Sequence, residues 1–179
     1  MTKETRRKLD EMLRELRLPG VGNCHVEAAR RAEKEGWSFE RFLHHVLDVE
    51  LEQRRQRRLE RVFKAAKLPP GKTLATLDQE RLPVKVRRQL PALIEGGFVD
   101  RGENLLAFGL PGRGKTHLVC ALGAELIQNG YTVHFTPAFA LVQRLLSARE
   151  TYGLEKELQR LDAFDVLIID DIGYIQQDR

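Results

Sequence analysis

The stretch FGLPGRGKTHL, Phe108–Leu118, decides the fold of this chain. It contains the Walker A pattern Gly-x-x-x-x-Gly-Lys-Thr, which Gly109, Gly114, Lys115 and Thr116 complete. This pattern is typical of a loop whose backbone N–H groups surround phosphate oxygens at the start of a helix. Lys115 would supply a cation for the outer phosphates, and Thr116 a hydroxyl for Mg²⁺. The pattern predicts a nucleotide-binding loop rather than a glycine-rich turn without a ligand.

The segments around this loop alternate between short apolar runs and longer amphipathic ones. We expect strands over 104–109, 132–136 and 165–170, and helices over 115–130, 139–153 and 154–164. Strands that alternate with helices in this way indicate an α/β domain in three layers, built on a parallel sheet. The loop then lies between the first strand and the first helix, as its mechanism requires.

The run VLIIDD, Val166–Asp171, ends a buried strand with two carboxylates. Asp170 is placed to hold Mg²⁺ through water, which is the Walker B role. Asp171 occupies the position at which many such ATPases use Glu to orient the attacking water. Its side chain is one methylene shorter, by about 1.5 Å of C–C bond, so its reach to that water is an open question.

The residues before this region have a helical pattern throughout. Apolar side chains at three- and four-residue spacing predict helices over 5–16, 24–35 and 39–67. The proline and glycines of LPGVGN, 18–23, are expected to separate the first two helices, and Ser38 to cap the third.

The prolines and glycine of LPPGKT, 68–73, end the third helix, and a short helix is expected over 83–94. We therefore expect three regions: a helical DNA- or partner-binding domain over 1–67, a linker with a lead-in helix over 68–102, and a nucleotide-binding core over 103–179.

Basic residues are concentrated in the first of these regions. Residues 1–67 hold 17 Lys and Arg against 12 Asp and Glu, whereas residues 68–179 hold 13 against 14. The candidates for contact with DNA are Arg54, Arg55, Arg57, Arg58, Arg61 and Lys64. Few aromatic residues interleave them, so the run predicts a contact with the phosphate backbone of double-stranded DNA that is indifferent to sequence. The alternative is a solvated helix face, partly neutralised by Glu50 and Glu52.

Composition favours a cytoplasmic protein without a membrane span. Hydrophobic residues make up 42% and charged residues 31% of the chain. No apolar run approaches the roughly 18 residues that a span requires. Cys24 and Cys120 are far apart and fit no metal-binding spacing, and reduced thiols are expected. His44 and His45 are neighbours on a helix and point in different directions, so they are not expected to bind one metal ion.

The stretches GLPGRGKTHL, GYTVHFTP, LVQRLLSARE and FDVLIIDDIGYIQQDR, in this order, resemble the IstB-type ATPases. These ATPases assist transposition by insertion sequences and are relatives of the DnaC helicase loaders in the AAA+ class. The N-terminal stretch ELEQRRQRRLERVFKAAKLPPGKTL resembles the same family, so the resemblance covers nearly the whole chain.

The resemblance implies an ATP-dependent, DNA-binding AAA+ protein that works with a transposase and, in intact members, forms a homo-oligomer on DNA. It implies nucleotide binding by Gly109, Leu110, Pro111, Gly112, Arg113, Gly114, Lys115, Thr116 and His117. Thr116 and Asp170 would hold Mg²⁺, and Lys115 and Asp171 would be the catalytic residues.

Family members continue past the point at which this sequence stops, at Arg179. The resemblance implies the strand order 5-1-4-3-2, in which a fourth strand lies between the Walker A and Walker B strands. We expect a C-terminally truncated form that lacks this sensor-1 strand, the arginine finger and the final helices. ATP hydrolysis is then expected to be weak or absent. The sheet is expected to be gapped, closed by direct pairing of the first and third strands, or filled by a partner.

Two other functions compete with this one. The first is a helicase-loader-like protein, or a non-catalytic DNA-binding module with a vestigial nucleotide fold. The second is a small P-loop kinase, which would need a lid and a substrate pocket after the Walker B strand. The residues after Asp171 are too few to form either of them.

Overall fold

The computed structural model describes residues 3–172, and the chain divides into two compact units, Met1–Arg58 and Leu59–Arg179. Each unit has an apolar core of its own. The domain boundaries expected at 67 and 102 stay predictions. No helix in the described range combines the length and the apolar character that a membrane span needs.

The first unit contains α1 (Lys3–Glu15), α2 (Pro19–Glu35) and the first part of α3 (Phe39–Ala66). Its core is formed by Leu13, Val21, Ala28 and Val46. Ser38 caps α3 as expected, since its Oγ accepts a hydrogen bond from the Arg41 N–H at 3.1 Å.

The start of α2 differs from the expectation. The sequence LPGVGN was expected to break the chain before a helix at Cys24, whereas α2 begins at Pro19 and includes Gly20 and Gly22. Proline is well suited to the first turn of a helix, because the N–H that it lacks would have no acceptor there. The two glycines therefore lie inside a helix rather than in a loop.

Glu50 of α3 determines where α2 begins. Its Oε2 accepts hydrogen bonds from the backbone N–H groups of Gly20 at 2.6 Å and Val21 at 3.2 Å. N–H groups in the first turn have no acceptor within their own helix, so this carboxylate replaces the missing partner. Arg54 donates from Nε to Glu50 Oε1 at 2.8 Å and from Nη2 to the carbonyl oxygen of Arg17 at 2.7 Å.

These contacts keep the buried Glu50 carboxylate charged. Burial alone would raise the pKa of Glu50, but the hydrogen bonds from Arg54, Val21 and Gly20 outweigh it, and the pKa lies below its ordinary value. The ion pair is thus fully hydrogen-bonded, which is the condition for a buried charge to be tolerated.

The close approach of α2 to α3 predicts opposite effects for its two glycines. A Cβ at Gly20 would lie 2.8 Å from Glu50 Oε2 and 2.9 Å from Glu50 Cα, whereas a Cβ at Gly22 would meet nothing within 4 Å. We expect Gly20→Ala to lower the free energy of unfolding of the first unit by about 1–3 kcal/mol. Gly22→Ala should raise it by about 0.5–1 kcal/mol, because alanine suits a helix better.

Urea unfolding measures both effects, followed by the fluorescence of Trp37, the single tryptophan of the chain. Equal effects of the two substitutions would contradict the assignment of Gly20 as a contact point.

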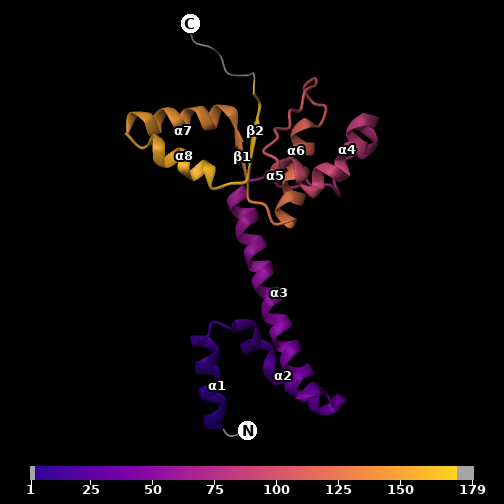
Figure 1. The fold of residues 1–179 in the computed structure, drawn as a ribbon, viewed down its shortest axis with the longest axis vertical. Helices are drawn as coiled ribbons and strands as arrows, with labels where there is room; N and C mark the ends of the chain where they lie inside the picture. The colour runs from indigo at the N-terminus through magenta and orange to yellow at the C-terminus, as the bar shows by residue number, and fades with distance from the viewer. Residues whose placement is uncertain (1–2, 173–179) are drawn as a thin grey trace. The chain divides into compact units, whose positions relative to one another are not determined.

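The second unit is an α/β arrangement of helices around a small parallel sheet (Figure 1). After the end of α3, its elements are η1 (Gln79–Arg81), α4 (Val84–Glu95), α5 (Gly97–Asp100), α6 (Lys115–Gln128), β1 (Val133–Pro137), α7 (Ala138–Glu150), α8 (Leu154–Asp162) and β2 (Val166–Asp170). β1 and β2 pair in parallel, in a register from Val133–Val166 to Pro137–Asp170. The expected fold class, an α/β P-loop core preceded by helices, is confirmed, although the chain is mostly helical.

The prediction of a first strand over 104–109 is wrong. Residues 104–109 have no regular secondary structure, and the sheet of the described residues contains only β1 and β2. A strand needs a neighbour for its backbone N–H and C=O groups. In the strand order that the resemblance implies, neither β1 nor β2 adjoins this segment. Of the arrangements expected for the sheet, direct pairing of this segment with β2 is therefore not present among residues 3–172.

The core of the second unit joins α6 to the sheet. Ala66, Leu122, Leu126, Ile127 and Val133 are buried in it. At Gly123 the helix backbone lies so close to the sheet that a Cβ would be 2.7 Å from Ile168 Cδ1 and 3.4 Å from Val133 Cγ1. The face of the sheet that carries these two side chains is therefore the one that α6 covers.

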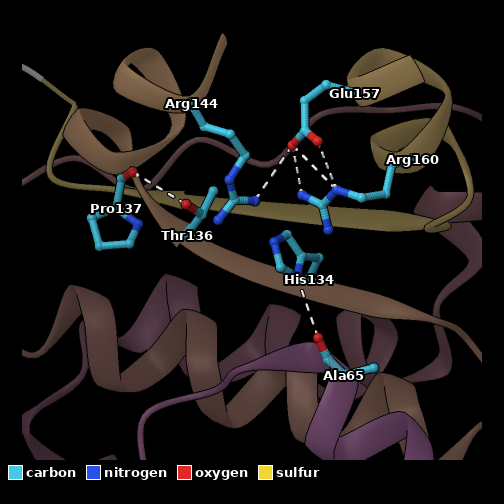
Figure 2. Close-up of polar contacts among 7 residues, drawn as sticks. All are labelled: Ala65, His134, Thr136, Pro137, Arg144, Glu157 and Arg160. Atoms are coloured by element: carbon cyan, nitrogen blue, oxygen red, sulfur yellow. Dashed lines mark hydrogen bonds and ion pairs between the residues drawn. The ribbon is translucent and has the colours of Figure 1, made fainter. Parts of the chain in front are cut away.

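Two residues of β1, His134 and Thr136, are polar and buried, and they lie in a cluster of polar side chains (Figure 2). The His134 side chain is only 1% exposed, its Nδ1 donates to the Ala65 carbonyl oxygen at 3.4 Å, and its ring stacks on Phe164 at 4.8 Å. Above it, Arg144 and Arg160 both reach Glu157. His134 is thus a structural residue of the strand.

Its surroundings keep His134 neutral. Burial lowers its pKa below the ordinary value, the bond to Ala65 opposes this, and the charges of Arg160, Arg144 and Lys67 lower it further. Within the described part of the chain, His134 Nε2 has no hydrogen-bond partner. A proton there would add a donor without an acceptor, and a positive charge, beside these cations.

This environment predicts a loss of stability in acid. The unfolded chain protonates His134 near its ordinary pKa of about 6.5, whereas the folded chain does so only at lower pH. The free energy of unfolding should therefore fall as the pH drops below about 6.5, by at most about 1.4 kcal/mol per pH unit from this group. His134→Asn keeps a donor for Ala65 but does not titrate, so its dependence on pH should be shallower. Urea unfolding followed by circular dichroism between pH 5 and 8 tests this, and parallel curves for the two proteins would contradict it.

Candidate functional site

The Walker A loop has the backbone that its glycines were expected to provide. Gly112 and Gly114 have φ values of 73° and 80°, in the left-handed region that side chains disfavour. α6 begins at once, at Lys115, and its first hydrogen bond runs from the Leu118 N–H to the Gly114 carbonyl oxygen at 2.9 Å. The N–H groups of the first turn therefore have no acceptor within the helix. This is the arrangement that binds phosphate at a helix N-terminus.

Lys115 lies back across this loop. Its Nζ donates to the carbonyl oxygens of Gly109 at 2.8 Å and Leu110 at 3.0 Å. The ammonium group is thus held beside the free N–H groups of the helix start. A phosphate bound there would compete with two neutral carbonyls for this cation, and a charged acceptor forms the stronger hydrogen bond.

The two residues expected to hold Mg²⁺ come together. Thr116 Oγ1 donates to Asp170 Oδ1 at 3.1 Å, although 54 residues separate them. The packing of α6 on the sheet places the first turn of the helix beside the end of β2. A hydroxyl and a carboxylate are the hard oxygen ligands that Mg²⁺ takes alongside phosphate oxygens and water, so these residues fit the ion. Within residues 3–172, no group of three or more His, Cys, Asp or Glu side chains is placed to hold a metal ion.

Asp171 directly follows β2 and is exposed. Its φ of 57° lies in the left-handed region, which is uncommon for a residue other than glycine but tolerated by Asp. Its role as the acidic catalytic residue stays a prediction. The following Gly173 and Tyr174, which contribute to the resemblance, lie outside the described residues.

A buried thiol lies next to the expected metal ligands. Cys120, one turn after Thr116, is fully buried. Burial raises its pKa to about 11, Lys72 opposes this shift, and Asp170 adds to it. The thiol is thus neutral, and the charges of Lys72 and Asp170 both reach it.

His117 does not point into the loop. Its Nε2 lies 3.2 Å from the carbonyl oxygen of Thr73 and 3.1 Å from Thr76 Oγ1. Only its backbone N–H, in the first turn of α6, is available to a phosphate. Nothing in the sequence indicated this contact with Thr73 and Thr76. Two threonines three residues apart after a glycine favour the hydrogen-bonded turn itself, but not its contact with His117.

The candidate DNA-binding residues are all exposed on α3. Arg54 is engaged by Glu50 and Arg17, Arg55 pairs with Glu52 at 3.1 Å, and Arg57 donates to Gln53. Arg58 and Lys64 form no hydrogen bond or ion pair with any residue in the range 3–172. Arg54 thus has a structural role that the run of charges did not indicate, and the DNA contact stays a prediction.

Comparison with protein families identifies the family that this chain matches. Residues 11–179 match the family described as IstB-like ATP binding protein. A protein named as an insertion sequence ATP-binding protein, from Sinorhizobium fredii, is 42% identical over 173 residues, which cover 96% of this chain and 58% of the relative. The chain therefore spans less than two thirds of that relative's length.

Two further relatives carry similar names. The ATP-binding protein of insertion sequence IS5376 from Geobacillus stearothermophilus is 35% identical over 96% of this chain and 68% of its own length. The ATP-binding protein of insertion sequence IS21 from Pseudomonas aeruginosa is 38% identical over 96% of this chain and 65% of its own length. With the phosphate loop and its paired Thr116 and Asp170, these similarities show that the chain belongs to the IstB-like ATP-binding protein family.

Proposed function

We propose that the chain binds ATP with Mg²⁺ at the Walker A loop, associates with double-stranded DNA through α3, and assists a transposase in the cytoplasm. The observation that carries the nucleotide site is the hydrogen bond between Thr116 and Asp170, next to a helix start with free N–H groups. The names of the relatives support an association with insertion sequences. Because the chain matches only part of the length of these relatives, the activity of the whole protein is also a proposal.

The residues of the site have different roles. The N–H groups of the first turn of α6 hold phosphate oxygens, and Lys115 adds a charge that moves from its present carbonyls. Thr116 and Asp170 would hold Mg²⁺, which when bound offsets the negative charge of the phosphates.

We propose that hydrolysis by this chain alone is weak. Asp171 has a shorter side chain than the Glu common at this position, and it is exposed to water. The segment before the loop, 104–109, is not held in the sheet. An exposed carboxylate and a loop that no strand precedes provide less of the positioning on which this kind of catalysis depends.

Substitution of Lys115 tests the nucleotide site. Lys115→Ala should weaken the binding of Mg²⁺–ATP at least about tenfold, because hydrogen bonds to charged groups contribute about 1.5–3 kcal/mol. Isothermal titration calorimetry measures the dissociation constant. Lys156→Ala removes an exposed lysine of α8 and is the matched control. If both variants bind like the unaltered chain, the loop is not the nucleotide site.

Substitution of α3 arginines tests the DNA contact. Arg54 is left intact because it stabilises the start of α2. The triple change Arg55→Gln, Arg57→Gln and Arg58→Gln should weaken DNA binding for all sequences alike. It should reduce the slope of log K against log salt by up to about 2.7, or about 0.9 per lost phosphate contact.

The control for this experiment removes the same charge from the same unit. It changes three exposed cations of α1 and α2, namely Arg14, Arg30 and Lys34, to Gln. Fluorescence anisotropy of labelled duplexes at several salt concentrations gives both slopes. Equal slopes for the two triple variants would refute a contact specific to α3.

A non-catalytic DNA-binding module is the second candidate. The position of 104–109 outside the sheet of the described residues favours it, because the loop then lacks the strand that its mechanism places before it. Under this alternative, DNA binding would survive Lys115→Ala and would not respond to ATP.

A further inference from the structure

The linker turn, Gly71–Thr76, lies against the first turn of α6. Because the carbonyl oxygen of Thr73 can only accept, His117 donates to it from Nε2, at 3.2 Å. The same nitrogen lies 3.1 Å from Thr76 Oγ1. His117 directly follows Thr116, so the linker turn is attached one residue beyond a ligand expected for Mg²⁺.

The linker turn is organised by one hydroxyl. Thr76 Oγ1 donates to the Gly71 carbonyl oxygen at 2.7 Å and accepts from the Thr73 N–H at 3.1 Å. The Thr76 N–H in turn donates to the Thr73 carbonyl oxygen at 3.2 Å, and the Leu77 N–H to that of Leu74 at 3.3 Å. These three amides report directly on whether the turn is formed.

The first turn of α6 is shared between the linker turn and the phosphate site. Its N–H groups have no acceptor in the helix, and a helix end in this condition frays. Fraying of residues 115–117 would move the imidazole of His117 away from Thr73 and Thr76. A phosphate that accepts from these N–H groups would hold the first turn, and with it the imidazole.

Lys72 gives the linker turn a second, electrostatic interaction near the site. It and Asp170 act with opposite sign on the same buried thiol, that of Cys120. The linker turn thus carries a cation whose charge reaches the same thiol as the carboxylate at the end of β2.

We propose that the linker turn is a nucleotide-responsive latch, which His117 holds closed and which a bound phosphate stabilises by ordering the first turn of α6. The latch rests on the nucleotide site proposed above and adds regulation to it. It couples the site to the segment that directly follows α3. Coupling between two sites is reciprocal. If the nucleotide stabilises the latch by a certain factor, loss of the latch weakens nucleotide binding by the same factor.

Hydrogen exchange of the full chain tests the latch. In the unaltered chain, Mg²⁺–ATP should slow exchange of the Thr73, Thr76 and Leu77 amides about fivefold or more, within the range typical of coupled sites. His117→Ala and Thr76→Val should abolish this slowing and weaken Mg²⁺–ATP binding by a similar factor. His117→Gln keeps a donor and should restore part of both effects.

Thr132→Val is the matched control. Thr132 Oγ1 also makes hydrogen bonds, donating to Asp165 Oδ2 at 2.8 Å and accepting from the Asp165 N–H at 3.0 Å, but these bonds join the residues before β1 and β2 and do not involve His117. It should leave the response of the linker amides to the nucleotide unchanged. Circular dichroism verifies that each variant is folded.

The outcomes separate the two proposals. If calorimetry shows Mg²⁺–ATP binding but the three amides exchange equally with and without it, the latch is overturned and the nucleotide site stands. The latch is also overturned if His117→Ala and Thr76→Val keep the slowing. If the unaltered chain binds no Mg²⁺–ATP, the nucleotide site fails and the latch with it.

Discussion

The close packing of α6 on the sheet at Gly123 is the constraint on which the second unit depends. The absence of a side chain there lets the helix axis approach Ile168 and Val133, and the direction of the helix is then fixed by the core along its length. One consequence is that Thr116, two turns earlier, meets Asp170 at the end of β2. The phosphate loop and the metal ligands are thus aligned by an apolar contact that takes no part in the chemistry.

The two units differ in what binds the backbone N–H groups at the start of a helix. In each unit these groups have no acceptor within the helix itself. In α2, a buried carboxylate from α3 supplies that acceptor permanently, and Arg54 neutralises its charge. In α6, no described side chain caps the helix, and the same holds for α4, α7 and α8. What sets the start of α6 apart is the glycine loop before it and the hydrogen bond between Thr116 and Asp170 beside it.

The sequence predicted what depends on local pattern. The helix from Lys115, the strands that became β1 and β2, and the pairing of Thr116 with Asp170 all followed from periodicity and motif spacing. Errors arose where distant residues decide the outcome. Residues 104–109 have the composition of a strand but no neighbouring strand within residues 3–172, and α2 begins at Pro19 because Gly20 binds a carboxylate 30 residues away. The contact of His117 with the linker turn depends on tertiary packing, which no spacing rule encodes.

Among the described residues β2 pairs with β1 alone, and its other edge has a consequence for how the chain behaves in solution. Leu167 and Ile169 are partly exposed on this strand, and Leu105, Leu106 and Phe108 are exposed on the irregular segment before the loop. Open backbone groups next to exposed apolar side chains invite pairing between molecules. Solubility, rather than folding, is therefore the property that this region limits. Cooling should ease handling of the chain, because hydrophobic association weakens as the temperature falls.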